Sequence, residues 1–194
     1  MAGFRKAERR KAKLRLGITG PAGSGKTASS LLIAYGLTND WSKIGIVDTE
    51  NGSGELYVNS TIGGTKIGEY NVLTLEAPYL PDKYIQAIKM AEEAGLEVVI
   101  IDSLTHAWAG EGGLLDLQGK IAQKTGNSWT AWRDVTPKHN ALVEAMLTSK
   151  IHLIATMRSK MDHVQEKDEK TGRTIIRKVG MAPIQREGMD YEMT

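Results

Sequence analysis

Residues 20–27, GPAGSGKT, constrain the chain more than any other feature because they fit the pattern G-x-x-x-x-G-K-[ST]. Glycines let successive backbone N–H groups turn inward around a phosphate without obstruction by Cβ atoms. Lys26 supplies a charge to the β- and γ-phosphates, and the Thr27 hydroxyl is a ligand for Mg²⁺. A predicted strand precedes the motif and a predicted helix follows it, with the helix's positive end toward the anion. The predicted nucleotide-binding residues are Gly20, Pro21, Ala22, Gly23, Ser24, Gly25, Lys26, Thr27 and Ala28.

Apolar stretches alternate with helical patterns along most of the chain. Strands are predicted over 14–19, 43–49, 71–75, 97–102 and 151–156. Helices are predicted over 26–37, 81–94 and 136–149, with helical turns over 114–124. Strands separated by helices describe βαβ units, so the sequence predicts an α/β fold with a parallel sheet in a doubly wound sandwich.

The segment after residue 157 has a different character. Residues 158–173 are polar, charged and weakly periodic, which predicts a mobile loop. Residues 174–179 alternate like a strand, and 190–194 resemble the beginning of another strand.

Two apolar strands end in carboxylates, one at Asp48 and Glu50 and the other at Asp102. A carboxylate at such an end lies beside the phosphate loop and holds Mg²⁺ through water. Asp102 follows the more continuous apolar run, as expected of the central strand next to the phosphate-loop strand, and is assigned to the metal. Hydrolysis also needs a carboxylate that orients or deprotonates the attacking water. Glu50 is the candidate and Glu55 a weaker one; the alternatives are a turn-capping role for Asp102 and a surface position for Glu50.

Composition limits the classes of protein that remain. The 194 residues carry a formal net charge of +2 and include no cysteine, which excludes disulfides, thiolate metal sites and a cysteine nucleophile. Seven Lys and Arg against Glu8 alone occupy the first 15 residues, so we expect a basic arm over 1–13 and one domain over 14–194. The arm either binds an acidic partner or is a solvated leader. No apolar run reaches ~18 residues and the N-terminus is charged, so we expect no membrane span and a cytoplasmic protein.

Four motifs, GPAGSGKT, IVDTE, VVIIDS and LIATMRSK, resemble the successive ATPase motifs of the RecA-like recombinase core. A wider set, KLRLGITGPAGSGKT, IIDSLTHAW, WRDVTPKH, IATMRSK and APIQREGMDYE, is similar to phage and prophage AAA-type ATPases, some described as RecA-like single-strand annealing recombinases. The resemblance implies a P-loop NTPase with a RecA-like core, in which helices flank a mainly parallel central sheet and a β-hairpin lies at the C-terminal end. It also implies ATP and Mg²⁺ as cofactors and, for a phage-encoded chain, the bacterial host cytosol.

Individual roles follow from the same resemblance. It gives Lys26 and Thr27 the phosphate-loop roles, Asp102 the magnesium role and Glu50 the role of the catalytic glutamate. Thr156 stands where RecA typically has a glutamine that senses the γ-phosphate, and Arg158 is a substitute candidate. The segment IIRKVGMAP resembles the region whose basic residues reach a neighbouring subunit's γ-phosphate. These candidates are Arg177 and Lys178, with Arg186 in reserve.

Residues 109–130 and 158–173 match the two loops that lie over the bound strand in RecA-like cores. Basic groups follow phosphates and an indole stacks on any base, which favours single-stranded DNA. The first segment has Lys120, Lys124 and Trp129, with Trp132 just beyond it. The second alternates basic with acidic residues, so a solvated loop is the alternative there; the two tryptophans are alternatively core anchors of the following helix.

The favoured hypothesis is an Mg-ATP-dependent, RecA-like ATP hydrolase that binds single-stranded DNA and assists phage recombination or annealing. A homo-oligomer, as a ring or filament, is expected, and a single-strand-binding protein is a further candidate partner. One alternative is a P-loop kinase of small molecules or nucleotides. The other is a non-catalytic ATP-binding module for a DNA or protein partner.

Overall fold

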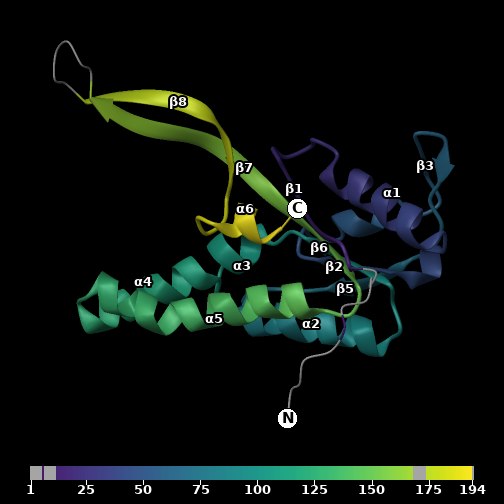
Figure 1. Ribbon diagram of the computed structural model, residues 1–194, viewed down its shortest axis with the longest axis horizontal. Coiled ribbons are helices and arrows are strands. Elements are labelled where there is room, and N and C mark those ends of the chain that lie inside the picture. The colour runs from purple at the N-terminus through teal and green to yellow at the C-terminus, as the bar shows by residue number, and fades with distance from the viewer. Residues whose placement is uncertain (1–5, 7–11, 168–173, 194) are drawn as a thin grey trace.

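The computed structural model describes residue 6, residues 12–167 and residues 174–193, and it has an α/β fold with a mainly parallel central sheet (Figure 1). The strands lie side by side in the order β1 (Arg15–Gly20), β7 (His152–Lys167), β6 (Val98–Asp102), β2 (Ile44–Asp48) and β5 (Asn71–Thr74). Each neighbouring pair in this row is parallel. The predicted fold class is therefore confirmed. Two short strands, β3 (Thr61–Ile62) and β4 (Thr65–Lys66), form a separate antiparallel pair.

Helices cover both faces of the sheet. On one face lies α1 (Lys26–Thr38), and on the other lie α2 (Pro81–Glu93) and α5 (Ser128–Thr148). Alternate residues of β6 serve the two faces, as side chains along a strand must. The α1 face packs Leu31 and Ala34 against Ile44, Ile46, Val98, Ile100 and Ile154. The opposite face packs Tyr84, Ile88, Leu142 and Met146 against Val47, Val99, Ile101 and Leu153.

Strand order differs from one expectation. The strand that ends at Asp102 was expected beside the phosphate-loop strand, but β7 lies between β1 and β6. The parallel strands nevertheless all end at one edge of the sheet, which is where ligands bind in open α/β sheets. This edge brings together Gly20, Asp48, Asp102 and Thr156, although they come from four different strands.

The prediction of a loop over 158–173 is wrong for its described part, because β7 continues to Lys167. It pairs antiparallel with β8 (Thr174–Pro183), from Ser159 opposite Pro183 to Lys167 opposite Thr174. This is the expected C-terminal hairpin, and it extends away from the body (Figure 1). Backbone pairing needs no apolar alternation in a ribbon that extends in this way, so hydropathy did not reveal the strand. Residues 168–173 lie outside the described residues.

Two other segments also differ from prediction. The helical turns predicted over 114–124 are confirmed as α4 (Leu114–Thr125), which follows α3 (Thr105–Ala109), so residues 109–130 do not form the open loop that the resemblance implies. Helix α5 begins at Ser128, well before the expected start at 136–137, since the Asn127 side chain accepts from the Trp129 N–H at 2.9 Å and caps it. The expected strand over 190–194 is instead helix α6 (Met189–Glu192), which begins after Gly188 at φ 92°. Two single 3₁₀ turns complete the elements, η1 (Trp41–Lys43) and η2 (Ser53–Glu55).

Most of the predicted basic arm, residues 1–5 and 7–11, lies outside the described residues. Among the helices that the structure does describe, none is long and apolar enough to cross a membrane.

Candidate nucleotide-binding site

The phosphate loop joins the end of β1 to the start of α1. Gly23 and Gly25 have φ values of 74° and 82°, which favour glycine because side chains with a Cβ rarely adopt them. These turns leave the backbone N–H groups of the first turn of α1 without helical acceptors. No acidic side chain lies in that turn. The loop therefore presents donors and the positive end of a helix to an anion, as predicted for residues 20–28.

Lys26 lies over this loop. Its Nζ donates to the carbonyl oxygen of Pro21 at 2.8 Å. The ammonium group is thus held at the mouth of the loop, within reach of an anion.

Asp102 is the buried acceptor of the site, with 3% of its surface exposed. The Thr27 hydroxyl donates to its Oδ2 at 2.6 Å, and the hydroxyl of Thr156 donates to its Oδ1. Strands β6 and β7 and helix α1 thus converge on one carboxylate. Thr156 is fully buried and touches Asp102, so it positions the carboxylate.

Thr27 and Asp102 together fit Mg²⁺. Hydroxyl and carboxylate oxygens are the hard donors that this ion prefers, and here they are adjacent. Within residues 12–167 and 174–193, no group of three or more His, Asp or Glu side chains is arranged to hold a metal. A Mg²⁺ site built from one or two protein oxygens, substrate phosphates and water needs no such group.

Glu50 follows β2 and faces the same site. Its Oε1 accepts from Arg158 Nε at 3.1 Å and from the Ser103 hydroxyl at 3.1 Å, and its Oε2 pairs with Arg158 Nη2. This two-point pair is the strong form of a guanidinium–carboxylate contact. Thr156 and Arg158, the two candidates for a γ-phosphate sensor, therefore have separate contacts, one with Asp102 and the other with Glu50.

A cavity of about 220 Å³, the nucleotide cavity, joins these groups. Glu50 lines it, whereas the weaker candidate Glu55 does not. The lining residues are Ala22, Gly23, Ser24, Gly25, Lys26, Thr27, Glu50, Ser53, Tyr57, Asp102 and Arg158.

Two supporting residues were not assigned roles from the sequence. Asp48 is fully buried, and its carboxylate accepts from the Glu50 N–H at 2.6 Å and from the Gly54 N–H at 3.2 Å. It therefore fixes the turn that carries Glu50. The position of Asp48 at the end of an apolar strand was the available signal.

His106 is the second supporting residue. Its Nδ1 lies 2.8 Å from the Thr49 hydroxyl oxygen, which also accepts from the Ser103 N–H at 2.8 Å. The ring stacks on Tyr79 with centroids 4.8 Å apart. Burial lowers the pKa of His106, so the imidazole is neutral at pH 7. His106 lies in the stretch IIDSLTHAW, which carries part of the family resemblance but assigns this histidine no role.

The remaining candidates come from the hairpin and the segment that follows it. Arg177 and Lys178 lie on β8, opposite Val164 and His163 in the hairpin. Arg186 follows the hairpin, and its guanidinium donates to the Thr136 hydroxyl at 3.2 Å. Among the described lining of the cavity around Lys26, Arg186 does not occur.

Comparison with known proteins bears on the family. A search of curated proteins found no match. A family model described as an AAA domain matches residues 12–194, which is nearly the whole chain. The phosphate loop, the parallel sheet and this match agree, and the chain belongs to the AAA domain family of nucleotide-binding ATPases.

Proposed function

We propose that the chain is a Mg²⁺-dependent, RecA-like ATP hydrolase that binds single-stranded DNA, assembles with further copies and assists phage recombination or annealing. One observation carries the ATPase part of this proposal. Lys26, Asp102 and Glu50 line a single cavity, although they come from the ends of three different strands or their loops. Phosphoryl transfer depends on such positioning and charge stabilisation more than on covalent chemistry by the protein.

In this mechanism, different groups of the chain bind the phosphates, hold the metal and activate the water. Backbone N–H groups of the loop and Lys26 hold the β- and γ-phosphates. Thr27 and Asp102 would hold Mg²⁺, which when bound neutralises charge that develops on these phosphates. Glu50 orients the attacking water and accepts its proton.

In the structure, the side chain of Arg158 is bonded to the carboxylate of Glu50. A carboxylate that accepts from a guanidinium and from the Ser103 hydroxyl has few lone pairs left for water. The pair between Arg158 and Glu50 must therefore open or turn before the carboxylate can act. Once released, the guanidinium lies at the mouth of the cavity, where it can stabilise charge on the γ-phosphate.

Assembly with further copies is supported by the hairpin. Met161 and Met181 lie opposite each other in its register, with 43% and 51% of their surfaces exposed. Neighbouring exposed apolar side chains on an extended ribbon favour contact with another protein surface. A second copy seated there would bring β8, with Arg177 and Lys178, toward a neighbouring molecule.

The DNA part of the proposal is supported by exposed basic and aromatic side chains outside the nucleotide cavity. Lys124 and Trp129 are exposed near the junction of α4 and α5, and Lys160 is exposed on β7. Lys120 is engaged in an ion pair with Asp116 at 2.8 Å and is a weaker candidate.

A non-catalytic ATP-binding module is the second candidate function. The observation that favours it is the engagement of Glu50 by Arg158 and Ser103, because a module needs no free carboxylate. The kinase alternative is weaker. A kinase needs a basic lid, and residues 158–167, which belong to the basic segment that could imitate one, are part of strand β7.

Phosphate release from ATP, measured with and without oligo(dT) at several protein concentrations, separates these functions. A DNA-stimulated ATPase with contacts between subunits should show turnover that rises with DNA and, per molecule, with protein concentration. ATP binding with negligible turnover would identify the module. Turnover that needs a small acceptor molecule and ignores DNA would identify a kinase.

A further inference from the structure

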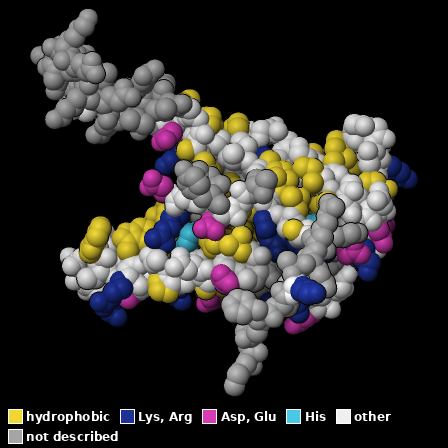
Figure 2. All heavy atoms as spheres, in the orientation of Figure 1, with side chains coloured by type: hydrophobic (Ala, Val, Ile, Leu, Met, Phe, Trp, Pro, Cys, Tyr) yellow, Lys and Arg dark blue, Asp and Glu magenta, His cyan; other side chains and the backbone are white. Residues whose placement is uncertain are grey.

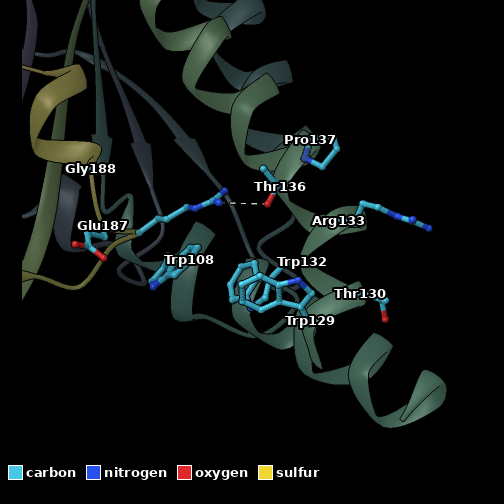
Figure 3. Close-up of a pocket in the computed structure, with 10 residues that line it drawn as sticks. Trp108, Trp129, Thr130, Trp132, Arg133, Thr136, Pro137, Glu187 and Gly188 are labelled. Carbon is cyan, nitrogen blue, oxygen red and sulfur yellow. Dashed lines mark hydrogen bonds between the residues drawn. The ribbon is translucent and has the colours of Figure 1, made fainter. Parts of the chain in front are cut away.

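A hollow of about 1220 Å³ lies outside the nucleotide cavity and shares no lining residue with it (Figure 3). Its walls come from α3, from the first half of α5 and from residues 186–188, which follow the hairpin. Three of the chain's four tryptophans line it. We call it the tryptophan cleft; its lining residues are Trp108, Trp129, Thr130, Trp132, Arg133, Thr136, Pro137, Arg186, Glu187 and Gly188.

The three indoles differ in how much of their surface is exposed and in whether they already stack on another ring. Trp108 and Trp132 stack with centroids 5.8 Å apart and an angle of 22° between their planes, and both are half-buried. Trp129, in the first turn of α5, has 87% of its surface exposed. It is therefore not a core anchor of the helix, which was the alternative interpretation of the sequence. A fully exposed indole beside two stacked ones is a surface ready to stack on a flat ligand.

Cationic groups accompany the rings. The Arg186 guanidinium lies 5.7 Å from the centre of the Trp132 ring and donates to Thr136. Arg133 is exposed on α5, one residue beyond Trp132. Glu187 is the single acidic residue of the lining. On the face shown in Figure 2, hydrophobic side chains gather over α4 and α5, with Lys or Arg side chains among them.

We infer that the tryptophan cleft binds single-stranded nucleic acid, with unpaired bases stacked on Trp129 and on the Trp108–Trp132 pair and with phosphates near Arg133 and Arg186. Aromatic rings that stack on bases and basic groups that follow the backbone are the two components of sequence-tolerant single-strand binding. In a duplex, each base already stacks on its neighbours and is not available to an indole. Trp and Arg are also enriched at protein–protein interfaces, so a protein partner is the other outcome that the test distinguishes. This inference rests on the proposed function, because it locates the DNA site within it.

Two walls of the tryptophan cleft, α3 and the segment after the hairpin, connect to the nucleotide cavity through Arg158. The Ile184 N–H donates to the Arg158 carbonyl at 2.7 Å, two residues before Arg186. The Arg158 N–H donates at 2.8 Å to the hydroxyl of Thr105, the first residue of the helix that carries Trp108. A strand bound in the cleft would therefore contact segments that are hydrogen-bonded to the backbone of Arg158, whose side chain pairs with Glu50. Through this connection, bound DNA would change the Arg158–Glu50 pair and with it the rate of ATP hydrolysis.

The test is fluorescence anisotropy of labelled oligo(dT) with the full chain and its variants, with ATP present. Trp129→Ala should weaken binding about tenfold or more, because it removes a stacking partner. Trp129→Phe should retain part of the affinity. Met90→Ala truncates an exposed apolar side chain on α2, outside the cleft, and should leave binding unchanged. An abasic strand of equal length should bind the parent and Trp129→Ala equally, since it has no bases to stack.

The outcomes separate the two proposals. If the parent chain binds oligo(dT) and both Trp129→Ala and the double variant Trp129→Ala/Arg133→Ala bind as tightly, the single strand binds elsewhere. The inference is then wrong, the proposed function stands and the cleft is left to a protein partner. If the parent chain binds no oligo(dT), the DNA part of the proposed function fails and the inference fails with it. ATP affinity of Trp129→Ala, measured in parallel, should equal that of the parent and shows that the variant is folded.

Discussion

The nucleotide cavity is lined by a glycine-rich loop and by side chains at strand ends, whereas the tryptophan cleft is lined by two helices and the segment after the hairpin. In the first, the lining residue Asp102 is buried and accepts a hydrogen bond from the buried Thr156 behind it. In the second, the ring of Trp129 is exposed to solvent. A substitution in the cavity therefore leaves buried groups without hydrogen-bond partners, whereas a substitution in the cleft removes an exposed surface that could contact a ligand. We therefore expect variants of the cavity to lose ATP turnover, ATP affinity or stability, and variants of the cleft to lose affinity for single-stranded nucleic acid.

The largest effect is expected for Glu50→Gln. The amide keeps the shape of the side chain but cannot accept a proton, so ATP turnover should fall by ~10²-fold or more while ATP binding persists. Phosphate release under saturating ATP measures this loss. Glu55→Gln is the matched control, because Glu55 is exposed and lies outside the cavity. Normal turnover in Glu50→Gln together with loss in Glu55→Gln would transfer the catalytic role to Glu55.

Lys26→Ala should weaken nucleotide binding itself. Removal of a charge-assisted contact to the phosphates costs about 1.5–3 kcal/mol, which is roughly a 10- to 150-fold loss of affinity for ATP. Calorimetric titration with ATP and Mg²⁺ measures it, and Lys89→Ala, an exposed lysine on α2, is the control. Unchanged ATP affinity in Lys26→Ala would mean that the nucleotide does not bind at this loop.

Thr156→Val tests the buried side of the same site. The valine fills the space of the threonine but donates no hydrogen bond to Asp102 Oδ1, so the free energy of unfolding should fall by ~1–3 kcal/mol. Urea denaturation measures the change. Thr125→Val removes an exposed hydroxyl that bonds a helix carbonyl at 2.8 Å and should cost far less. Equal losses in the two variants would mean that the bond to Asp102 contributes no more than a surface contact.

The contrast between the two regions also explains what the sequence could predict. The phosphate loop needs glycine at positions 23 and 25, where φ is positive, so its geometry is determined by residues that are close together in the sequence. Asp102 and Glu50 could be found because parallel strands end at one edge of a sheet. For the tryptophan cleft, the sequence indicated Trp129 and Trp132 as candidate stacking residues, but it did not place them with Trp108 and Arg186, because Arg186 and Thr136 are 50 residues apart and meet only in the folded chain.

Errors in the predicted fold have similar causes. The order of strands depends on which helices pack on which face, and hydropathy along the chain does not record that β7 lies between β1 and β6. The helix start predicted at 136 rests on Pro137, because proline favours the first turn of a helix. The start was instead set by Asn127, whose side chain caps α5, and Pro137 lies inside that helix.

The smallest expected effect is on pH dependence, and it compares one histidine from each region. Burial lowers the pKa of His106 beside the nucleotide cavity and of His139, which lies edge-on to Trp108 under the tryptophan cleft. A depressed pKa means that the unfolded chain binds more protons than the folded one as pH falls below about 6.5, so the free energy of unfolding decreases there. Each histidine contributes at most about 1.4 kcal/mol per pH unit. Urea denaturation from pH 7.5 to 5.5 should show this decline, and His106→Gln and His139→Gln should each make it shallower. A decline that neither variant alters would place the titrating groups elsewhere, in which case neither buried imidazole is the source.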